Sequence, residues 1–179
     1  EGDCLAEART VMTEEKSKIL DFHLTGTEVA ETEMICGGDV EVFLEPLPPG
    51  VGDLYAHVLE VQKRGEEAVL ATRISEGPLP EGMGRKGLVL SEGNIVGPLA
   101  LDRQALKAAQ EVIKEKEGRL IPYHEDRLYL EPVYAEPHLY VFGAGHISRY
   151  IAPVASMVGF QVIVIDDRAE FVHRDHFPR

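Results

Sequence analysis

Two short apolar runs, separated by a glycine-containing turn and a helix-like segment, constrain this chain most strongly. The first run, Leu139–Phe142, leads into Gly143-Ala144-Gly145, and the second run, Val162–Ile165, ends in Asp166 and Asp167. A buried strand, a glycine turn before a helix and a second strand that ends in an acidic residue are typical of the start of a dinucleotide-binding βαβ motif. We therefore predict a Rossmann-like motif at the C-terminal end of the chain.

The glycine turn predicts a binding site for a phosphate. Gly143 would permit the tight bend, Gly145 would let the backbone approach a pyrophosphate, and Ser148 stands at the third position, where helix and strand pack. The helix expected over residues 146–157 would direct its positive N-terminal end at the phosphate. The ring of His146 would lie beside that phosphate, and a local capping role is the alternative for this residue.

The acidic residues at the end of the second run are candidates for reading a ribose. Asp166, with Asp167 as the neighbouring alternative, is placed where a carboxylate can accept hydrogen bonds from the ribose hydroxyls. A retained fold with an empty or altered pocket would explain the same pattern without a nucleotide. NAD or another nucleotide is therefore one candidate ligand of this motif.

The Rossmann-like motif is short. Only twelve residues follow Asp167 before the chain ends at Arg179, and the chain begins with Glu1 rather than Met. Two parallel strands and one helix cannot cover a parallel sheet on both faces. We therefore expect the remaining strands to lie in a removed segment or on another chain.

The first 134 residues lack the regular alternation of strands and helices that marks a doubly wound sheet. The predicted fold class is α/β, with an N-terminal α+β domain over residues 1–134 and the first βαβ part of a Rossmann-like parallel sheet over residues 135–179. Hydrophobic periodicity predicts helices over 3–15, 53–63 and 103–117, and strands over 18–24, 39–44, 68–74, 87–90, 95–96, 119–123 and 127–133.

The charge of the chain argues against two classes of partner. The formal net charge is −13, with 31 acidic residues against 18 basic ones. This excess repels nucleic-acid phosphates and anionic lipid, so we expect no nucleic-acid partner and no membrane association. Two cysteines, Cys4 and Cys36, are too few for a disulfide framework, which favours a cytoplasmic protein.

A second candidate site precedes the strand predicted over residues 39–44. Cys36 is followed directly by Gly37 and Gly38, and glycines at a strand entry allow a ligand to approach the backbone closely. A cysteine beside exposed backbone N–H groups can have a lowered pKa and act as a thiolate. The alternative is a small buried residue at a tight turn.

Three runs together resemble the xanthine dehydrogenase accessory factor family, of the XdhC/CoxI type. They are Cys-Gly-Gly-Asp-Val-Glu-Val-Phe-Leu-Glu-Pro at 36–46, Phe-Gly-Ala-Gly-His-Ile at 142–147 and Asp-Asp-Arg-Ala-Glu-Phe at 166–171. The resemblance implies an α+β domain followed by a Rossmann domain, and often a homodimer. It also implies a chaperone that binds the molybdenum cofactor (molybdopterin) and delivers it to a molybdenum hydroxylase such as xanthine dehydrogenase.

The resemblance assigns site residues by position in the family's motifs. The cofactor-binding candidates are Cys36, Gly37, Gly38, Gly143, Gly145, His146, Asp166 and Asp167. A sulfur-donating desulfurase is a further candidate partner, because the cofactor is protected while its terminal sulfur ligand is installed. No catalytic residue is assigned, and a cofactor chaperone need not be an enzyme.

Two other hypotheses follow from the residues. The first is a NAD-dependent oxidoreductase, although no Tyr-x-x-x-Lys or comparable set of proton-transfer residues is visible. The second is a metal site at His173 and His176, which we do not expect because no third ligand lies nearby in sequence.

Overall fold

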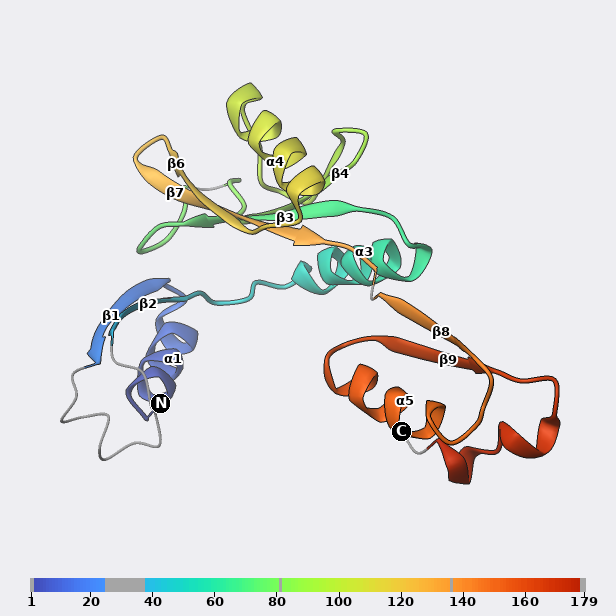
Figure 1. The fold of residues 1–179 in the computed structure, drawn as a ribbon. Helices are drawn as coiled ribbons and strands as arrows, with labels where there is room; N and C mark the ends of the chain where they lie inside the picture. The colour runs from blue at the N-terminus through green and yellow to red at the C-terminus, as the bar shows by residue number, and fades with distance from the viewer. Residues whose placement is uncertain (1, 25–37, 81, 136, 178–179) are drawn as a thin grey trace. The chain divides into compact units, whose positions relative to one another are not determined.

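The computed structural model describes residues 2–24, 38–80, 82–135 and 137–177. The chain divides into two compact units, shown in Figure 1. Unit 1 comprises Glu1–Glu60 and Glu67–Val133, and unit 2 comprises Val61–Glu66 and Tyr134–Arg179. None of the described helices is long and apolar enough to cross a membrane.

Unit 1 is built around a five-stranded antiparallel sheet with the strand order β5-β4-β3-β7-β6. The strands are β3 (Ala68–Ile74), β4 (Lys86–Leu90), β5 (Ile95–Val96), β6 (Arg119–Tyr123) and β7 (Asp126–Val133). A hairpin at Gly93-Asn94 joins β4 to β5, and in it the amide of Leu90 donates to the carbonyl of Asn94 at 2.9 Å. One pair of strands adjacent in sequence therefore lies on each side of the central strand β3: β4 and β5 on one side, β6 and β7 on the other.

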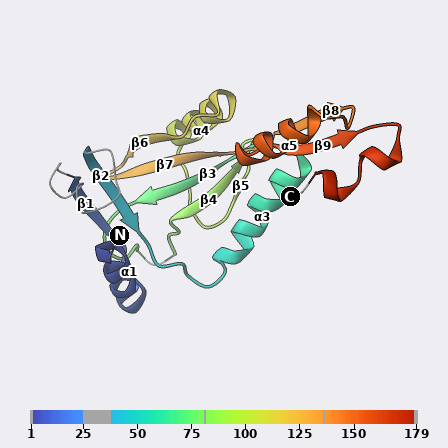
Figure 2. The same cartoon turned by 60° about the horizontal axis from the view of Figure 1, so that its bottom comes forward.

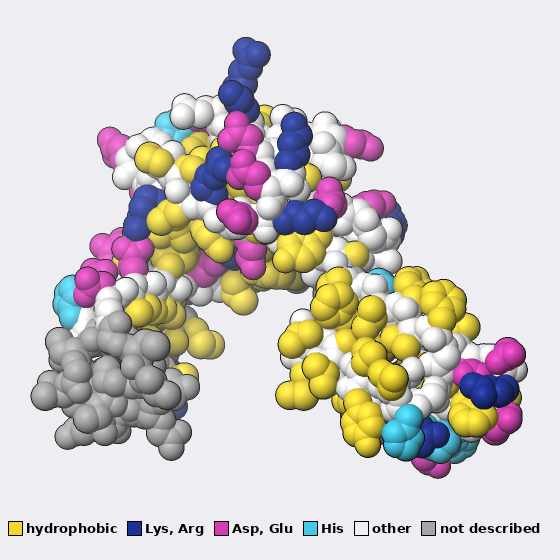
Figure 3. All heavy atoms as spheres, in the orientation of Figure 1, with side chains coloured by type: hydrophobic (Ala, Val, Ile, Leu, Met, Phe, Trp, Pro, Cys, Tyr) yellow, Lys and Arg dark blue, Asp and Glu magenta, His cyan; other side chains and the backbone are white. Residues whose placement is uncertain are grey.

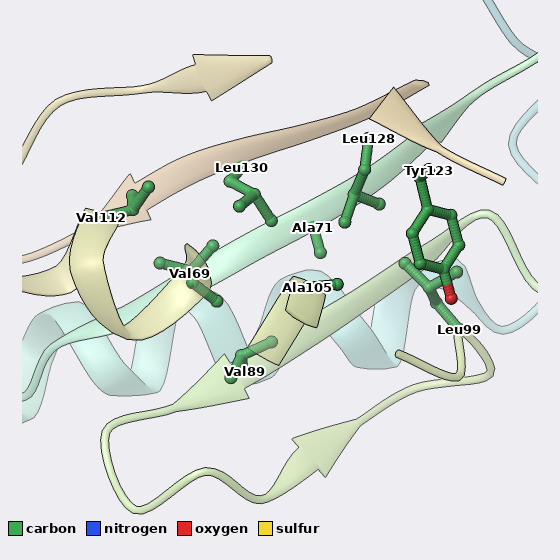
Figure 4. Packing of buried hydrophobic residues seen from close by; sticks show 10 residues of the cluster. Val69, Ala71, Val89, Leu99, Ala105, Val112, Tyr123, Leu128 and Leu130 are labelled. Atoms are coloured by element: carbon green, nitrogen blue, oxygen red, sulfur yellow. The ribbon is translucent and has the colours of Figure 1, made fainter. Parts of the chain in front are cut away.

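Helices cover both faces of this sheet. Side chains of a strand alternate between faces, so Val69 and Ala71 of β3 point one way and Ala68 and Leu70 the other, and all four are buried. Helix α4 (Arg103–Glu115) packs on the first face, and helix α3 (Val51–Arg64) passes behind the sheet (Figure 2, Figure 4). Burial on both faces explains why the central strand reads as a continuous apolar run.

The core of unit 1 lies between α4 and the sheet (Figure 4). Its members are small and branched side chains together with one tyrosine, whose hydroxyl donates to the carbonyl of Ala100 at 2.9 Å. They are Val69, Ala71, Val89, Leu99, Ala105, Ala109, Val112, Tyr123, Leu128 and Leu130.

A helix and a two-stranded hairpin precede the sheet of unit 1. Helix α1 (Gly2–Glu14) leads into β1 (Lys18–Leu24), which pairs antiparallel with β2 (Gly38–Leu44). Ser17 connects these elements to the sheet region, since its buried hydroxyl lies 2.7 Å from the carbonyl of Ser75 and 2.9 Å from that of Gly77. The hairpin is thus tied to the segment that follows β3.

Unit 2 contains the βαβ motif expected from the sequence. Strands β8 (His138–Phe142) and β9 (Gln161–Ile165) are parallel, with Phe142 opposite Ile165, and helix α5 (Ser148–Met157) connects them. Two short 3-10 helices, Ala169–Phe171 and Arg174–His176, follow β9. The mixed α/β fold class predicted from the sequence is confirmed.

One face of the two-stranded sheet in unit 2 is open. Tyr140 and Phe142 of β8, with Ile163 and Ile165 of β9, are exposed, whereas the alternate residues that face α5 are half-buried. The outer face of α5 is also apolar, and hydrophobic side chains gather over it in Figure 3; they include Ile147, Tyr150, Val154 and Met157. Among the described residues, nothing covers these two surfaces.

Several helix ends differ from the sequence prediction by one or two residues, and those of α4 and α5 have a visible local context. Helix α4 ends at Glu115 rather than at residue 117, because Lys116 adopts a left-handed conformation and its amide donates to the carbonyl of Val112. Helix α5 begins at Ser148 rather than at residue 146. In both cases periodicity located the helix, and local hydrogen bonding set its end.

The N-terminal cap of α4 gives a first testable prediction. A carboxylate oxygen of Asp102 accepts a 2.8 Å hydrogen bond from the amide of Ala105. We expect Asp102→Ala to lower the free energy of unfolding by about 1 kcal/mol in a urea titration. Asp102→Asn keeps a capping oxygen and should retain most of that stability, so equal losses in both variants would contradict the capping role.

Candidate functional site

The glycine turn of unit 2 begins directly after β8. Gly143 has φ +96°, a backbone conformation that residues with a side chain rarely adopt. Its amide donates to the carbonyl of Ile165 at 2.7 Å, at the end of β9. The turn therefore bends sharply while remaining bonded to the neighbouring strand.

Ser148 explains how the third position of the turn works without a glycine. Its hydroxyl donates to the carbonyl of Gly143, and the residue is buried as the first residue of α5. The side chain thus closes the turn from the helix side. The serine at the third position thus joins the helix to the turn by a hydrogen bond, and the sequence pattern did not predict this bond.

Three consecutive backbone amides at the end of the turn are available to a ligand. Within the described part of the chain, the amides of Gly145, His146 and Ile147 have no acceptor, and α5 has no side-chain capping hydrogen bond. Such amides at the start of a helix form a site for a phosphate or another anion. Gly145 and His146 thus contribute amides of this kind, and their predicted role in binding a phosphate stays a prediction.

His146 lies at this site with an exposed ring. The ring makes an edge contact with that of Tyr150, with 6.0 Å between the ring centroids. Among the described residues, the first residue before α5 is Ile147, and no side-chain hydrogen bond caps the helix. Its ring is free to lie beside a bound anion.

Asp166 is held in place by four hydrogen bonds. One carboxylate oxygen accepts from the amide of Ala144 at 2.7 Å and from Nη2 of Arg168 at 3.0 Å. The other accepts from the amide of Arg168 at 3.0 Å and from its Nε at 2.9 Å. The side chain is only 2% exposed, so in this arrangement the carboxylate joins the end of β9 to the glycine turn.

These bonds also set the ionisation of Asp166. The guanidinium of Arg168 lowers the pKa of this carboxyl most, followed by the hydrogen bonds from the backbone amides of Ala144 and Arg168. The pKa of Arg168 is raised in return, mainly by the same side-chain hydrogen bond. The pair is therefore ionised throughout the physiological pH range.

Asp167 and Arg168 differ in exposure from Asp166. The side chain of Asp167 is 97% exposed and lies 3.7 Å from Nε of Arg168. The guanidinium of Arg168 also lies over the ring of Phe171, 4.2 Å from its centroid. Sequence reasoning missed Arg168 as a site residue, although its position next to two acidic residues was a visible signal. A ribose could reach Asp167 directly, but it could reach Asp166 only by replacing Arg168.

The second candidate site falls largely outside the described residues. Cys36 and Gly37 lie outside the described residues, so their predicted roles stay predictions. Gly38 is the first residue of β2, where it pairs with Leu24 at the exposed end of the hairpin. Its φ of +153° fits a glycine at a strand entry.

No metal site is visible in residues 2–24, 38–80, 82–135 and 137–177. No group of three or more His, Cys, Asp or Glu side chains in these ranges could hold a metal ion. His173 and His176 contact each other edge to face, with their ring centroids 6.5 Å apart.

Comparison with known families identifies the βαβ motif. Residues 139–179 match the family model described as the XdhC Rossmann domain. Over these residues the chain is similar to that family. The XdhC segment contains β8, α5, β9 and the glycine turn, and the resemblance to xanthine dehydrogenase accessory factors is confirmed by this match.

Two known proteins resemble larger parts of the chain. The uncharacterized protein YqeB of Escherichia coli (strain K12) is 27% identical over 109 residues, which cover 51% of this chain and 20% of YqeB. The crystal structure of a xanthine dehydrogenase from Bacillus halodurans superposes with a TM-score of 0.72 at 20% identity, covering 99% of this chain and 50% of that one. The chain thus spans half or less of the length of these relatives, and the second comparison establishes shared fold.

Proposed function

We propose that this protein acts in the maturation of xanthine dehydrogenase or a related molybdenum hydroxylase, as a factor that binds the molybdenum cofactor and delivers it to the enzyme. The observation that carries the proposal is the match of residues 139–179 to the XdhC Rossmann domain. The fold shared with the Bacillus halodurans protein is consistent with it. In this role the protein holds and transfers a ligand and needs no catalytic turnover.

The glycine turn offers a site that fits the phosphate of a pterin cofactor. The free amides of Gly145, His146 and Ile147 can donate to phosphate oxygens, and the N-terminal end of α5 favours negative charge there. The fixed carboxylate of Asp166 holds the turn in this shape through the amide of Ala144. When bound, the cofactor supplies the molybdenum centre that the client enzyme uses.

The remaining parts of the proposal come from the family resemblance. Cys36 would lie near the metal or its sulfur ligand, and a desulfurase would supply the sulfur. Assembly as a homodimer and a cytoplasmic location belong to the same proposal.

The NAD-dependent oxidoreductase is the second hypothesis from the sequence, and the structure offers it less support. In a nicotinamide enzyme, the acid at the end of the second strand accepts the ribose hydroxyls. Here both oxygens of Asp166 already accept hydrogen bonds and the side chain is buried. Of the two acidic residues, only Asp167 has an exposed carboxylate that could accept the ribose hydroxyls.

An activation assay with matched cysteine variants tests the proposed function. The protein, purified from cells that make the cofactor, should contain pterin that fluoresces after acid oxidation and should activate cofactor-free xanthine dehydrogenase. We expect Cys36→Ala to lower activation by about tenfold or more, as losses around a metal centre commonly do. Cys4→Ala, in α1, is the control and should activate normally.

Two results would contradict the proposal. One is a preparation without pterin in which Cys36→Ala and the unaltered protein behave alike towards the client enzyme. The other is tight binding of NAD or NADH in calorimetry together with hydride transfer to a carbonyl substrate, which would favour the oxidoreductase.

A further inference from the structure

Unit 1 contains a cavity of about 960 Å³ that none of the predicted site residues lines. It is lined by α1, the connection from β2 to α3, the segment between β3 and β4, and the residues that follow β5. Figure 2 shows the β2–α3 connection that forms one of its walls. We propose that this cavity binds an organic anion with a largely apolar body, and that Arg85 receives the anionic group.

The walls of the cavity are mostly apolar. Val11 of α1 and Leu54 of α3 are almost fully buried, and Leu44, Leu79 and Val96 add further aliphatic surface. Five prolines at positions 46, 48, 49, 78 and 98 also line it. Small-molecule sites typically have volumes of about 300–1,000 Å³, with apolar walls and few polar groups, and this cavity has both properties.

Arg85 supplies a positive charge that forms no direct ion pair with a carboxylate of the described residues. Its Nη1 donates to the carbonyl of Ser75 at 3.0 Å and to the hydroxyl of Ser75 at 2.8 Å, and its Nη2 donates to the carbonyl of Gly77 at 2.5 Å. These acceptors are all neutral, and within the described ranges Arg85 forms no ion pair. Burial is the main reason that the pKa of Arg85 is lowered.

The guanidinium keeps donors for a ligand. An arginine has five N–H groups, and the hydrogen bonds of Arg85 leave its Nε hydrogen and one Nη2 hydrogen without an acceptor among the described residues. The backbone carbonyls hold the guanidinium in one place, over the ring of Phe43 at 5.7 Å from the ring centroid. A carboxylate or phosphate could therefore bind a preorganised cation.

The neighbouring charges favour an anion at the same end of the cavity. Lys86 lies beside Arg85 and is paired with Glu45 at 2.6 Å, with side chains 11% and 14% exposed. Arg73 and Asp126, which also act electrostatically on Arg85, form an ion pair of their own, so among the described residues of this region Arg85 remains the cation without a paired carboxylate. The other charged lining residues, Glu15 and Asp53, and the ring of His57 belong to exposed residues. The buried part of the cavity is therefore positive in a chain whose net charge is −13.

Fluorescent naphthalene probes test this proposal on the purified protein. The probes are 1-naphthyl phosphate, 1-naphthoate and the neutral 1-naphthalenemethanol, and their binding is followed by fluorescence. We expect both anions to bind more tightly than the alcohol, and the stronger of the two identifies the ligand as a phosphate or a carboxylate. Equal affinity for all three probes would overturn the role of Arg85.

Two variants with matched controls locate the binding. Arg85→Gln removes the charge and should weaken anion binding by about tenfold or more without changing binding of the alcohol. Its control is Arg127→Gln, at an arginine that pairs with Glu41 outside the cavity. Retention of anion binding by Arg85→Gln would overturn the proposal.

The second variant fills the cavity and leaves Arg85 unchanged. Ala8 of α1 lines the cavity, so Ala8→Trp should abolish binding of both anions, whereas Ala6→Trp, on the exposed side of the same helix, should not. Circular dichroism shows whether each variant is folded. Anion binding that is equal in Ala8→Trp and Ala6→Trp would place the site elsewhere and overturn the proposal.

A competition experiment separates this inference from the proposed function. If pterin-6-carboxylate displaces 1-naphthyl phosphate from the protein but not from Ala8→Trp, the cavity is a site for a pterin anion. If naphthyl phosphate binds through Arg85 and the pterin does not compete, the cavity stands as an anion site that is independent of the molybdenum cofactor.

Discussion

The Asp166→Asn variant is expected to loosen the glycine turn of the XdhC segment. Asparagine keeps one oxygen but replaces the other by an NH₂ group, which would face the donors of Ala144 or Arg168. Hydrogen exchange at the Ala144 amide should then accelerate by about 10- to 100-fold, because a hydrogen bond to a charged acceptor is lost.

The same carboxylate predicts a dependence of stability on pH. The pKa of Asp166 is lower in the folded protein than its usual value of about 3.9, so the unfolded chain binds the proton more readily. The stabilisation from Asp166 is therefore complete above about pH 4 and is lost as the pH falls towards the folded pKa. Protection of the Ala144 amide should decline in this acid range, and Asp166→Asn should remove the contribution of this group to the decline.

Asp167→Asn is the matched control for both measurements. Its side chain is 97% exposed and 3.7 Å from the nearest Arg168 nitrogen, so exchange at Ala144 should remain unchanged. If Asp166→Asn and Asp167→Asn exchanged alike, the turn would not depend on the carboxylate of Asp166.

The Leu130→Ala variant is expected to destabilise unit 1 strongly. Leu130 lies in β7, opposite Ala71 of the central strand, and its side chain is fully buried in the core beneath α4. Truncation of such a leucine removes apolar contact and leaves a cavity, at a cost of about 2–5 kcal/mol. Urea unfolding followed by circular dichroism measures the loss, because the chain has no tryptophan to serve as a fluorescent reporter.

Leu120→Ala provides the comparison within the same sheet. Leu120 lies in β6, opposite Tyr129 of β7, and it is 49% exposed. Its truncation should cost less than about 1 kcal/mol, because much of its surface is already in contact with water. A similar loss of stability in the two variants would show that Leu130 does not belong to a closely packed core.

The strands of unit 1 were predictable from sequence because apolar residues either alternate along them or, in the central strand β3, form a continuous run that is buried on both faces. The bounds predicted for residues 18–24, 68–74, 95–96 and 119–123 agree with β1, β3, β5 and β6. Helix α4 was predictable from its apolar periodicity and from the cap at Asp102. The end of α4 was not, because the left-handed Lys116 replaces the glycine that commonly occupies such a position.

The candidate site was predictable in part. The order of strand, glycine turn, helix, strand and acid located Gly143, Gly145 and Asp166 in one motif, and this arrangement is local in sequence. The partners of Asp166 were not predictable, since a carboxylate at the end of a strand can bind a ribose or a neighbouring cation with the same chemistry. The conformation of Arg168 decides between these uses, and only the structure shows that its guanidinium turns back onto Asp166.

The sequence by itself determined the α/β class, the parallel βαβ motif and the XdhC resemblance, because each depends on residue types at fixed spacing. Only the tertiary structure decided that Ser148 closes the turn, that Asp166 braces it, and that Arg85 faces a cavity. The physical reason is that residue spacing specifies neither the conformation of a side chain nor the segments that pack against it, and these decide its hydrogen-bond partners and its burial. The cavity is lined by residues from α1 and by residues that follow β5, and no local sequence pattern predicts that these segments lie together.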